Sequence, residues 1–288
     1  MPRIAIVTDS TADMPLSFYE ENDVEMVPLV VRFGNKSYKD WVEMPPETFY
    51  GLLRESEVLP KTSQPSVQEF IEAYKRHSDC DHIISIHISA KLSGTFQSAY
   101  IASQNVDLPV TVIDSKNASA GLGLIVKSLV QARSEGKGAG QMISIAERMA
   151  NSIKDIFYVD TLKYLEMGGR IGKATALAGS ILKIKPILTL DDGIVAPLRK
   201  VKGRKRAVSE IVSLVKAFCE GRRVNIGLAH ADISSAIDEI ELALKEADIN
   251  SNVVIKSQIG SVIGTYVGPD AFAILVYKDD ILADLPFF

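Results

Sequence analysis

Residues 3–13 read RIAIVTDSTAD, in which a short apolar run leads directly into hydroxyl and carboxyl side chains. The stretches HIISIHIS at 82–89 and PVTVIDS at 109–115 have the same form. Apolar runs of this length, separated by segments of helical period, are typical of buried parallel strands joined by crossover helices. The first half of the chain is therefore predicted to be an α/β unit with a parallel sheet.

Helix signals lie between these strands. Pro45 and Pro46 begin one helix, and Ser66 with Glu69 forms a capping box at the start of another. Residues 25–33 (EMVPLVVRF) are predicted to form a further strand that ends at the turn Gly34-Asn35. The expected helices are 45–54, 66–76, 96–104, 120–133 and 140–152.

The pattern changes near Asp155. Asp191-Asp192-Gly193 stands between the apolar runs 186–190 and 194–201, which predicts a β-hairpin. We therefore predict two closely packed α/β domains with a cleft between them: 1–154 with the parallel sheet, and 155–288 with a mixed sheet. The other expected elements of the second half are strands at 156–160, 224–228, 252–256 and 271–276 and helices at 162–167, 175–183, 205–218 and 234–246.

Length and composition restrict the class of protein. The chain has 288 residues, more than one ordinary core holds, and 47% of them are hydrophobic, as expected of a folded protein with two domains. The formal net charge of -4 gives no reason to expect nucleic acid as a partner. The basic stretch 199–206 has two open interpretations: a solvated strand end and helix entrance, or a docking surface for an acidic partner or a phosphate.

The cysteines and the lengths of the apolar segments indicate where in the cell the protein is expected. Cys80 and Cys219 belong to no metal-binding or redox motif, so we expect a reduced, cytoplasmic protein without a disulfide framework or zinc site. The first apolar run is too short for a signal peptide, and no apolar stretch approaches the roughly 18 residues that would cross a bilayer. Neither export nor stable membrane insertion is expected.

Hydroxyl-rich loops follow the predicted strands, at 8–13, 62–66, 89–95 and 114–115. Ligand sites in α/β sheets lie in such carboxyl-end loops. Ser, Thr and Asp are also the preferred N-caps of helices, so capping explains one such residue in each loop. In LSGT at 92–95 a hydroxyl, a glycine and free amides at a helix start come together, which favours binding of a carboxylate or phosphate.

Enzyme motifs are weak by comparison. GRIGKAT at 169–175 lacks the spacing of a phosphate-binding P-loop, and no GxGxxG, HExxH or GxSxG motif is present. His82 and His87 stand at the two ends of one apolar strand, which favours core or strand-edge roles, and His230 follows another strand without an evident nucleophile. We predict no catalytic residue, no metal ligand and no cofactor.

Seven stretches in order resemble the DegV family of bacterial fatty-acid-binding proteins. Their order and spacing carry the resemblance over essentially the whole chain. They are VTDSTAD at 7–13, TSQPS at 62–66, ISAKLSGTFQSA at 88–99, VIDS at 112–115, DTLKYLEMGGRI at 160–171, KPIL at 185–188 and GSVIGTYVGP at 260–269.

The resemblance implies a Rossmann-like first domain, a mixed-sheet second domain and a long-chain fatty acid in a tunnel between them. By the family's motifs, the hydroxyls of Thr62 and Ser93 bind the carboxylate and Gly94 contributes its backbone amide. Arg170 and Tyr266 are implied as neighbours of the head group. Residues 176–181 and 184–190 are candidates for the tunnel wall, although ordinary core packing explains them equally well.

Members of this family that are subunits of fatty-acid kinase deliver the acid to a separate ATP-binding subunit, which forms an acyl phosphate for phospholipid synthesis. The resemblance therefore implies such a kinase partner. Many of these members have histidine at the position of Tyr266, and often glycine at that of Asp270, so lipid binding is supported more strongly than the partnership. Two alternatives are a carbonyl- or phosphate-handling subunit related to dihydroxyacetone kinase, which requires a reactive histidine, and a lipid-sensing regulator.

Overall fold

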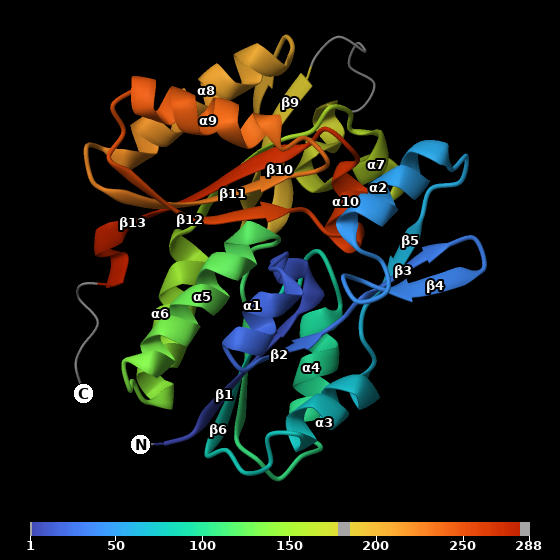
Figure 1. The fold of residues 1–288 in the computed structure, drawn as a ribbon, viewed down its shortest axis with the longest axis vertical. Coiled ribbons are helices and arrows are strands. Elements are labelled where there is room, and N and C mark those ends of the chain that lie inside the picture. Colours follow the sequence, from blue (N-terminus) through green and yellow to red (C-terminus); the bar gives the residue numbers. More distant parts are fainter. Residues whose placement is uncertain (1, 178–184, 283–288) are drawn as a thin grey trace.

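The computed structural model describes residues 2–177 and 185–282, and this part of the chain is built around two main sheets (Figure 1). One is parallel throughout, in the order β2-β1-β6-β7, and the other is mixed, in the order β10-β9-β8-β13-β11-β12. The predicted combination of a Rossmann-like parallel sheet and a mixed sheet is confirmed. The strands are β1 (Ile4–Asp9), β2 (Val24–Val27), β6 (His82–His87), β7 (Val110–Asp114), β8 (Lys154–Tyr158), β9 (Lys185–Asp191), β10 (Ile194–Val201), β11 (Val224–His230), β12 (Ser251–Gln258) and β13 (Phe272–Lys278).

Helices cover both faces of both sheets. In Figure 1, α8 and α9 lie on the outer face of the mixed sheet, α3 and α4 lie against the parallel sheet, and α5 and α6 lie between the two sheets. Burial on both faces explains why β1 is a continuous apolar run rather than an alternating one. The helices are α1 (Leu16–Glu21), α2 (Pro46–Glu55), α3 (Val67–Lys75), α4 (Thr95–Ser103), α5 (Ala120–Ser134), α6 (Ala139–Ser152), α7 (Lys163–Met167), α8 (Arg204–Cys219), α9 (Ser235–Glu246) and α10 (Ser261–Val267).

The two halves of the chain share their largest hydrophobic core. Helix α5 packs against β1 of the parallel sheet and against β11 and β12 of the mixed sheet. One buried cluster accordingly contains Ile6 and Ile84 from the first half and Leu188 and Leu275 from the second. The division at residues 154 and 155 remains a prediction, and the mixed sheet begins at Lys154.

The prediction of a single strand over residues 25–33 is wrong. The segment splits at Pro28-Leu29 into β2 of the parallel sheet and β3 (Val30–Phe33) of a separate three-stranded sheet. Proline has no N–H to donate to a ladder, so it marks the point where the chain leaves one sheet for another. The small sheet has the order β4-β3-β5 and also contains β4 (Lys36–Lys39) and β5 (Lys61–Ser63), which the sequence did not indicate.

Other differences concern short helical segments. The helix expected at 175–183 is replaced in its described part by a 3-10 turn, Gly172–Leu177, and residues 178–184 lie outside the described part of the chain. Helices α1 and α10 were not predicted, whereas the hairpin of β9 and β10 around Gly193 is confirmed. Among the described helices, none has the length and apolar character needed to cross a membrane.

Candidate functional site

A cavity of about 360 Å³ lies where the two halves of the chain meet. Its lining comes from the mixed sheet, from β5 of the small sheet, from the loop after β6 and from α7 and α10, and most of its side chains are apolar. A largely apolar cavity with a few polar groups is the usual form of a site for a small ligand. The aliphatic and phenyl side chains of the wall are Leu29, Ile88, Leu92, Phe157, Leu165, Leu190, Val195, Ile259, Val262, Ile263, Val267, Phe272 and Leu275.

Four of the five predicted site residues line this cavity: Thr62, Ser93, Arg170 and Tyr266. They come from β5, the loop before α4, the segment after α7, and α10, which are far apart in the sequence. The fifth, Gly94, lines a neighbouring hollow rather than the cavity itself. The fold thus brings together the side chains that the motifs indicated.

Direct contacts hold three of these side chains in one cluster. The hydroxyl oxygens of Thr62 and Tyr266 lie 2.5 Å apart, and the guanidinium carbon of Arg170 lies 5.1 Å from the centre of the Tyr266 ring. Arg170 also donates from Nε to the carbonyl oxygen of Leu92, at 3.2 Å, which brings it beside Ser93. The polar groups therefore form one end of the cavity.

The loop before α4 is held by its own hydroxyl groups. The Ser93 and Thr95 hydroxyl oxygens lie 2.8 Å apart, and Ser93 Oγ also accepts a 3.3 Å hydrogen bond from the Thr95 amide. Gly94 is the N-cap of α4, and a side chain there would collide with Gln64, whose Oε1 lies 2.2 Å from the position of a Cβ atom. The side-chain amide of Gln64 therefore packs directly on the backbone at Gly94 and would have to move if a larger residue stood there.

The polar end of the cavity continues into a second hollow of about 370 Å³. Ser93 and Arg170 line both spaces, and the hollow is otherwise bounded by loop residues that include Lys91, Gly94 and Gly169. Arg170 itself is exposed. A head group bound at the polar end would therefore be accessible from outside the apolar cavity.

Two buried carboxyl groups from the first half fix α10, the helix that carries Tyr266. Asp40 Oδ1 accepts hydrogen bonds from the amide and hydroxyl of Ser261, at 2.9 and 2.6 Å. Asp13 Oδ1 accepts from the Gly260 amide at 2.9 Å, and its Oδ2 accepts from Ser119 at 2.5 Å. Acidic groups at the start of a helix satisfy its free amides, so these contacts set the position of α10.

The same two carboxyl groups have raised pKa values. Burial raises the pKa of Asp13 to about 8, with a further contribution from the nearby charge of Asp40. Burial also raises the pKa of Asp40 to about 6, against the hydrogen bonds from Ser261 that favour its ionised form. Desolvation outweighs hydrogen bonding at both groups, so Asp13 is largely protonated at neutral pH.

The match to known proteins covers nearly all of the chain. The model described as "Uncharacterised protein, DegV family" matches residues 3–279. The chain belongs to the DegV family. The resemblance seen in the seven sequence stretches is confirmed.

Relatives within the DegV family are similar over their full length. A DegV domain-containing protein of Caldanaerobacter subterraneus is 38% identical over 274 residues, which are 94% of this chain and 97% of that protein. A fatty acid-binding protein of Thermotoga maritima is 36% identical, over 93% of this chain and 95% of that protein. A solved structure of a DegV family protein from Thermus thermophilus, described for its fatty acid binding, aligns with a TM-score of 0.91 at 34% identity, over 96% of this chain and 99% of that one.

Two of the four hydroxyl-rich loops in this DegV chain serve the fold rather than the cavity. Asp9 caps the turn Ser10–Ala12, where its Oδ1 accepts from the amide of Thr11 at 3.0 Å. Its Oδ2 accepts from the amide of Ile88, also at 3.0 Å. In the loop after β7, the Asp114 carboxyl accepts from the amide of Ala90, at 3.1 Å. Asp9 and Asp114 therefore hold the start of the 88–95 loop in place through hydrogen bonds to its backbone amides.

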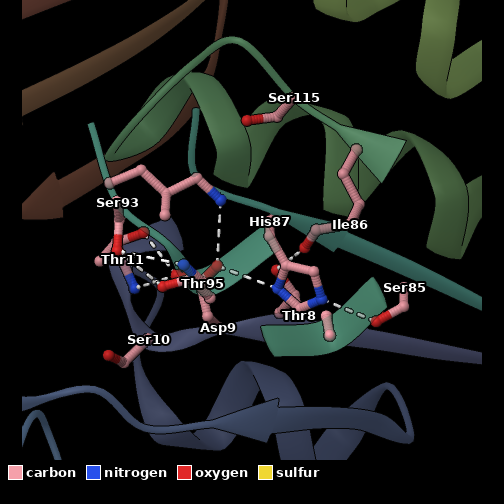
Figure 2. Close-up of polar contacts among 12 residues, drawn as sticks. Thr8, Asp9, Ser10, Thr11, Ser85, Ile86, His87, Ser93, Thr95 and Ser115 are labelled. Atoms are coloured by element: carbon pink, nitrogen blue, oxygen red, sulfur yellow. Dashed lines mark hydrogen bonds and ion pairs between the residues drawn. The ribbon is translucent and has the colours of Figure 1, made fainter. Parts of the chain in front are cut away.

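Asp9, His87 and Ser85 form a line of side chains that the sequence did not reveal. Figure 2 shows His87 between the other two, with Nδ1 3.1 Å from Asp9 Oδ2 and Nε2 2.7 Å from Ser85 Oγ. The order resembles the triad of hydrolases, but all three residues have 0% exposure and Ser85 is further bonded to Tyr74. No substrate reaches Ser85 in this arrangement, so the line joins β1 to β6.

Further predictions from the motifs can be placed on the DegV fold. Leu190 of the candidate tunnel segment 184–190 lines the cavity, and residues 178–184 lie outside the described part of the chain. Two members of the basic stretch pair with acids of the surrounding helices, Arg199 with Glu210 and Arg204 with Glu239. No group of three or more metal-ligating side chains occurs among residues 2–177 and 185–282. The histidine needed for dihydroxyacetone chemistry is absent from the described lining of the cavity.

Gln64 and Asp155 are among the polar lining residues that the sequence-based predictions missed. Gln64 belongs to the TSQPS motif, and its amide donates to Ser98 Oγ at 3.0 Å. Asp155 lines the cavity from β8 and is only 4% exposed. The available signal was an acidic residue at the start of an otherwise apolar strand, DIFYV.

Proposed function

We propose that this protein binds a long-chain fatty acid in the cavity, with the carboxylate at the polar end. The observation that carries the proposal is the meeting of Thr62, Ser93, Arg170 and Tyr266 at one end of a largely apolar cavity. Relatives described as fatty acid-binding proteins, similar over their whole length, support it.

The polar end has the chemistry that a carboxylate requires. Hydroxyl groups of Thr62, Ser93 and Tyr266 donate hydrogen bonds to carboxylate oxygens, and Arg170 supplies the positive charge. Hydrogen bonds to a charged group are stronger than those between neutral groups, so these residues select and orient the acid.

The apolar wall supplies most of the affinity. Burying about a dozen methylene groups at roughly 0.8 kcal/mol each gives on the order of 10 kcal/mol before the costs of association. Such a tail binds without specific polar contacts. The division between an apolar tail region and a polar head region matches the two parts of the cavity.

We further propose that the bound acid is presented to a separate ATP-dependent kinase subunit, which would form the acyl phosphate. The support is the hollow beside Ser93 and Arg170, which leaves the head group accessible. Tyr266 replaces the histidine common in such subunits, so the tyrosine would act through hydrogen bonding rather than through charge.

The decisive experiment for binding is extraction of the purified protein with organic solvent, followed by mass spectrometry. One fatty acid per chain is expected. Extracts from several independent preparations that contain no stoichiometric fatty acid would refute the proposal. The handover is tested separately, by adding a fatty-acid kinase subunit and ATP and measuring acyl-phosphate formation.

A further inference from the structure

One lining residue does not suit a plain alkyl chain. Asp155 lies on β8 with its side chain in the cavity lining and only 4% of its surface exposed. Its backbone carbonyl accepts from the Thr189 hydroxyl at 2.7 Å. Its carboxyl group has a hydrogen bond from the backbone of Asp155 itself, but no hydrogen bond or ion pair from another described residue reaches it. A buried polar group without a partner is costly, and such groups usually have a ligand or a water as partner.

Asp155 lies toward the opposite end of β8 from the segment that leads to the head-group cluster. In the pairing of β8 with β13, Tyr158 is opposite Phe272, and Asp155 is opposite Leu275. The chain runs from Tyr158 into α7 and Arg170, and it enters Phe272 from α10 and Tyr266. Asp155 is three positions from Tyr158 along the strand, a rise of about 10 Å.

A buried oxygen without a hydrogen-bond partner lies near the Asp155 carboxyl group. Asn117 Oδ1 is buried and has no hydrogen-bond partner, while its amide nitrogen donates to the carbonyl groups of Ser115 and Ala150. A Cβ atom on Gly121 would lie 2.9 Å from Asn117 Oδ1 and 3.2 Å from Asp155 Oδ1. The two oxygens therefore approach one small region that the absence of a side chain at Gly121 leaves open.

The protonation of Asp155 indicates what it can bind. Burial raises the pKa of Asp155 to about 8, so at neutral pH the group is mainly a neutral acid that both donates and accepts hydrogen bonds. An alkyl chain can neither donate nor accept a hydrogen bond in this part of the cavity. A hydroxyl group can do both, whichever form the carboxyl group takes.

We propose that the preferred ligand is a hydroxy fatty acid whose hydroxyl group, part-way along the chain, is hydrogen-bonded by Asp155. This inference rests on the proposed function, because it assumes a fatty acid with its carboxylate at Thr62, Ser93, Arg170 and Tyr266. It goes further in naming the class of acyl chain. The hydroxyl supplies a hydrogen bond that no other described residue gives to the Asp155 carboxyl group.

The test compares stearic acid with mid-chain hydroxystearic acids that differ in the position of the hydroxyl group. Affinities are measured by isothermal titration on delipidated protein, for the wild type, Asp155→Leu and Asp155→Asn. The wild type is expected to bind one positional isomer about tenfold more tightly than stearic acid, as one well-placed hydrogen bond in a dry site would give. Asp155→Leu should reverse this preference, and Asp155→Asn, which keeps a donor and an acceptor, should retain most of it.

The outcomes separate this inference from the proposed function. Wild-type protein that binds stearic acid as tightly as every hydroxy isomer, or more tightly, would overturn the inference and leave fatty-acid binding in place. An unchanged preference in a folded Asp155→Leu variant would also overturn it. Binding of neither class of acid would overturn the proposed function itself. The ratio of the wild-type affinities for hydroxystearic and stearic acid tests the inference even if Asp155→Leu does not fold.

Discussion

The hydroxyl groups of Tyr266 and Thr62 lie 2.5 Å apart, although 204 residues separate them in the sequence. Tyr266 belongs to α10 and Thr62 to β5, so this contact joins the two halves of the chain across the polar end of the cavity. An entering carboxylate has more acceptor sites than either hydroxyl and can receive a hydrogen bond from both. The two hydroxyl groups are thus positioned to donate hydrogen bonds to the same carboxylate head group.

Tyr266→Phe is expected to weaken fatty-acid binding by about tenfold, because it removes one hydrogen bond to a charged group and keeps the ring that Arg170 contacts. The measurement is titration of delipidated protein with a saturated long-chain acid. Tyr164→Phe is the matched control, since Tyr164 lies on neighbouring α7 and does not line the cavity. Equal losses in the two variants would contradict a specific role for the Tyr266 hydroxyl.

Ser93→Ala should reduce the amount of acid that stays bound during purification, again by about tenfold in affinity. The residue contributes a hydroxyl to the polar end, and it also accepts from the Thr95 amide at the start of α4. Helix content from circular dichroism must therefore be compared with that of the wild type. Ser103→Ala, at the other end of α4, is the control, because among the described residues that hydroxyl bonds the nearby Tyr100 carbonyl and Gln104 side chain and nothing in the cavity. Full retention of lipid by Ser93→Ala would rule out its assigned role.

Gly168→Ala should destabilise the protein by about 1–3 kcal/mol and also weaken acid binding, through overpacking against the Tyr266 ring and the Tyr164 backbone. A Cβ atom at Gly168 would lie 2.4 Å from the Tyr266 ring and 3.0 Å from the backbone oxygen of Tyr164. The ring must shift away from Thr62 to make room. Denaturant unfolding and acid titration measure the two effects. Gly138→Ala, which meets nothing within 4 Å, is the control and should have little effect on binding.

The sequence was sufficient to predict most strands and helices of the two main sheets, but it indicated neither the small sheet, α1 and α10 nor the contacts between distant elements. Strands β1 and β6 could be recognised because both faces are buried and their residues form continuous apolar runs. The break at Pro28 was visible in the sequence, but a proline alone does not show that the chain enters a second sheet. The placement of Tyr266 beside Thr62 depends on Asp13 and Asp40 reaching α10 from more than 200 residues away. Their proximity was predicted only from the resemblance to the DegV family.

Stability should fall as the pH rises from about 4 to about 8, through Asp13, Asp40 and Asp155. Burial raises the pKa of Asp13 and of Asp155 to about 8 and that of Asp40 to about 6, from an ordinary value of 3.8. Between these values the folded state keeps a proton that the unfolded state has released. The stability that each group contributes is therefore complete below pH 4 and is lost as the pH rises through the folded-state pKa.

The measurement is the free energy of unfolding by urea at a series of pH values, for the wild type and for Asp13→Asn and Asp155→Asn. Asparagine at 13 can still accept from the Gly260 amide but has no proton to lose. Each variant should therefore lose less stability than the wild type between pH 6 and pH 8. The comparison removes the opposing effect of His82 and His230, because burial lowers their pKa values equally in all three proteins. If the free energy of unfolding depends on pH in the same way in the wild type and the variants, the pKa values of these carboxyl groups are not raised in the folded protein.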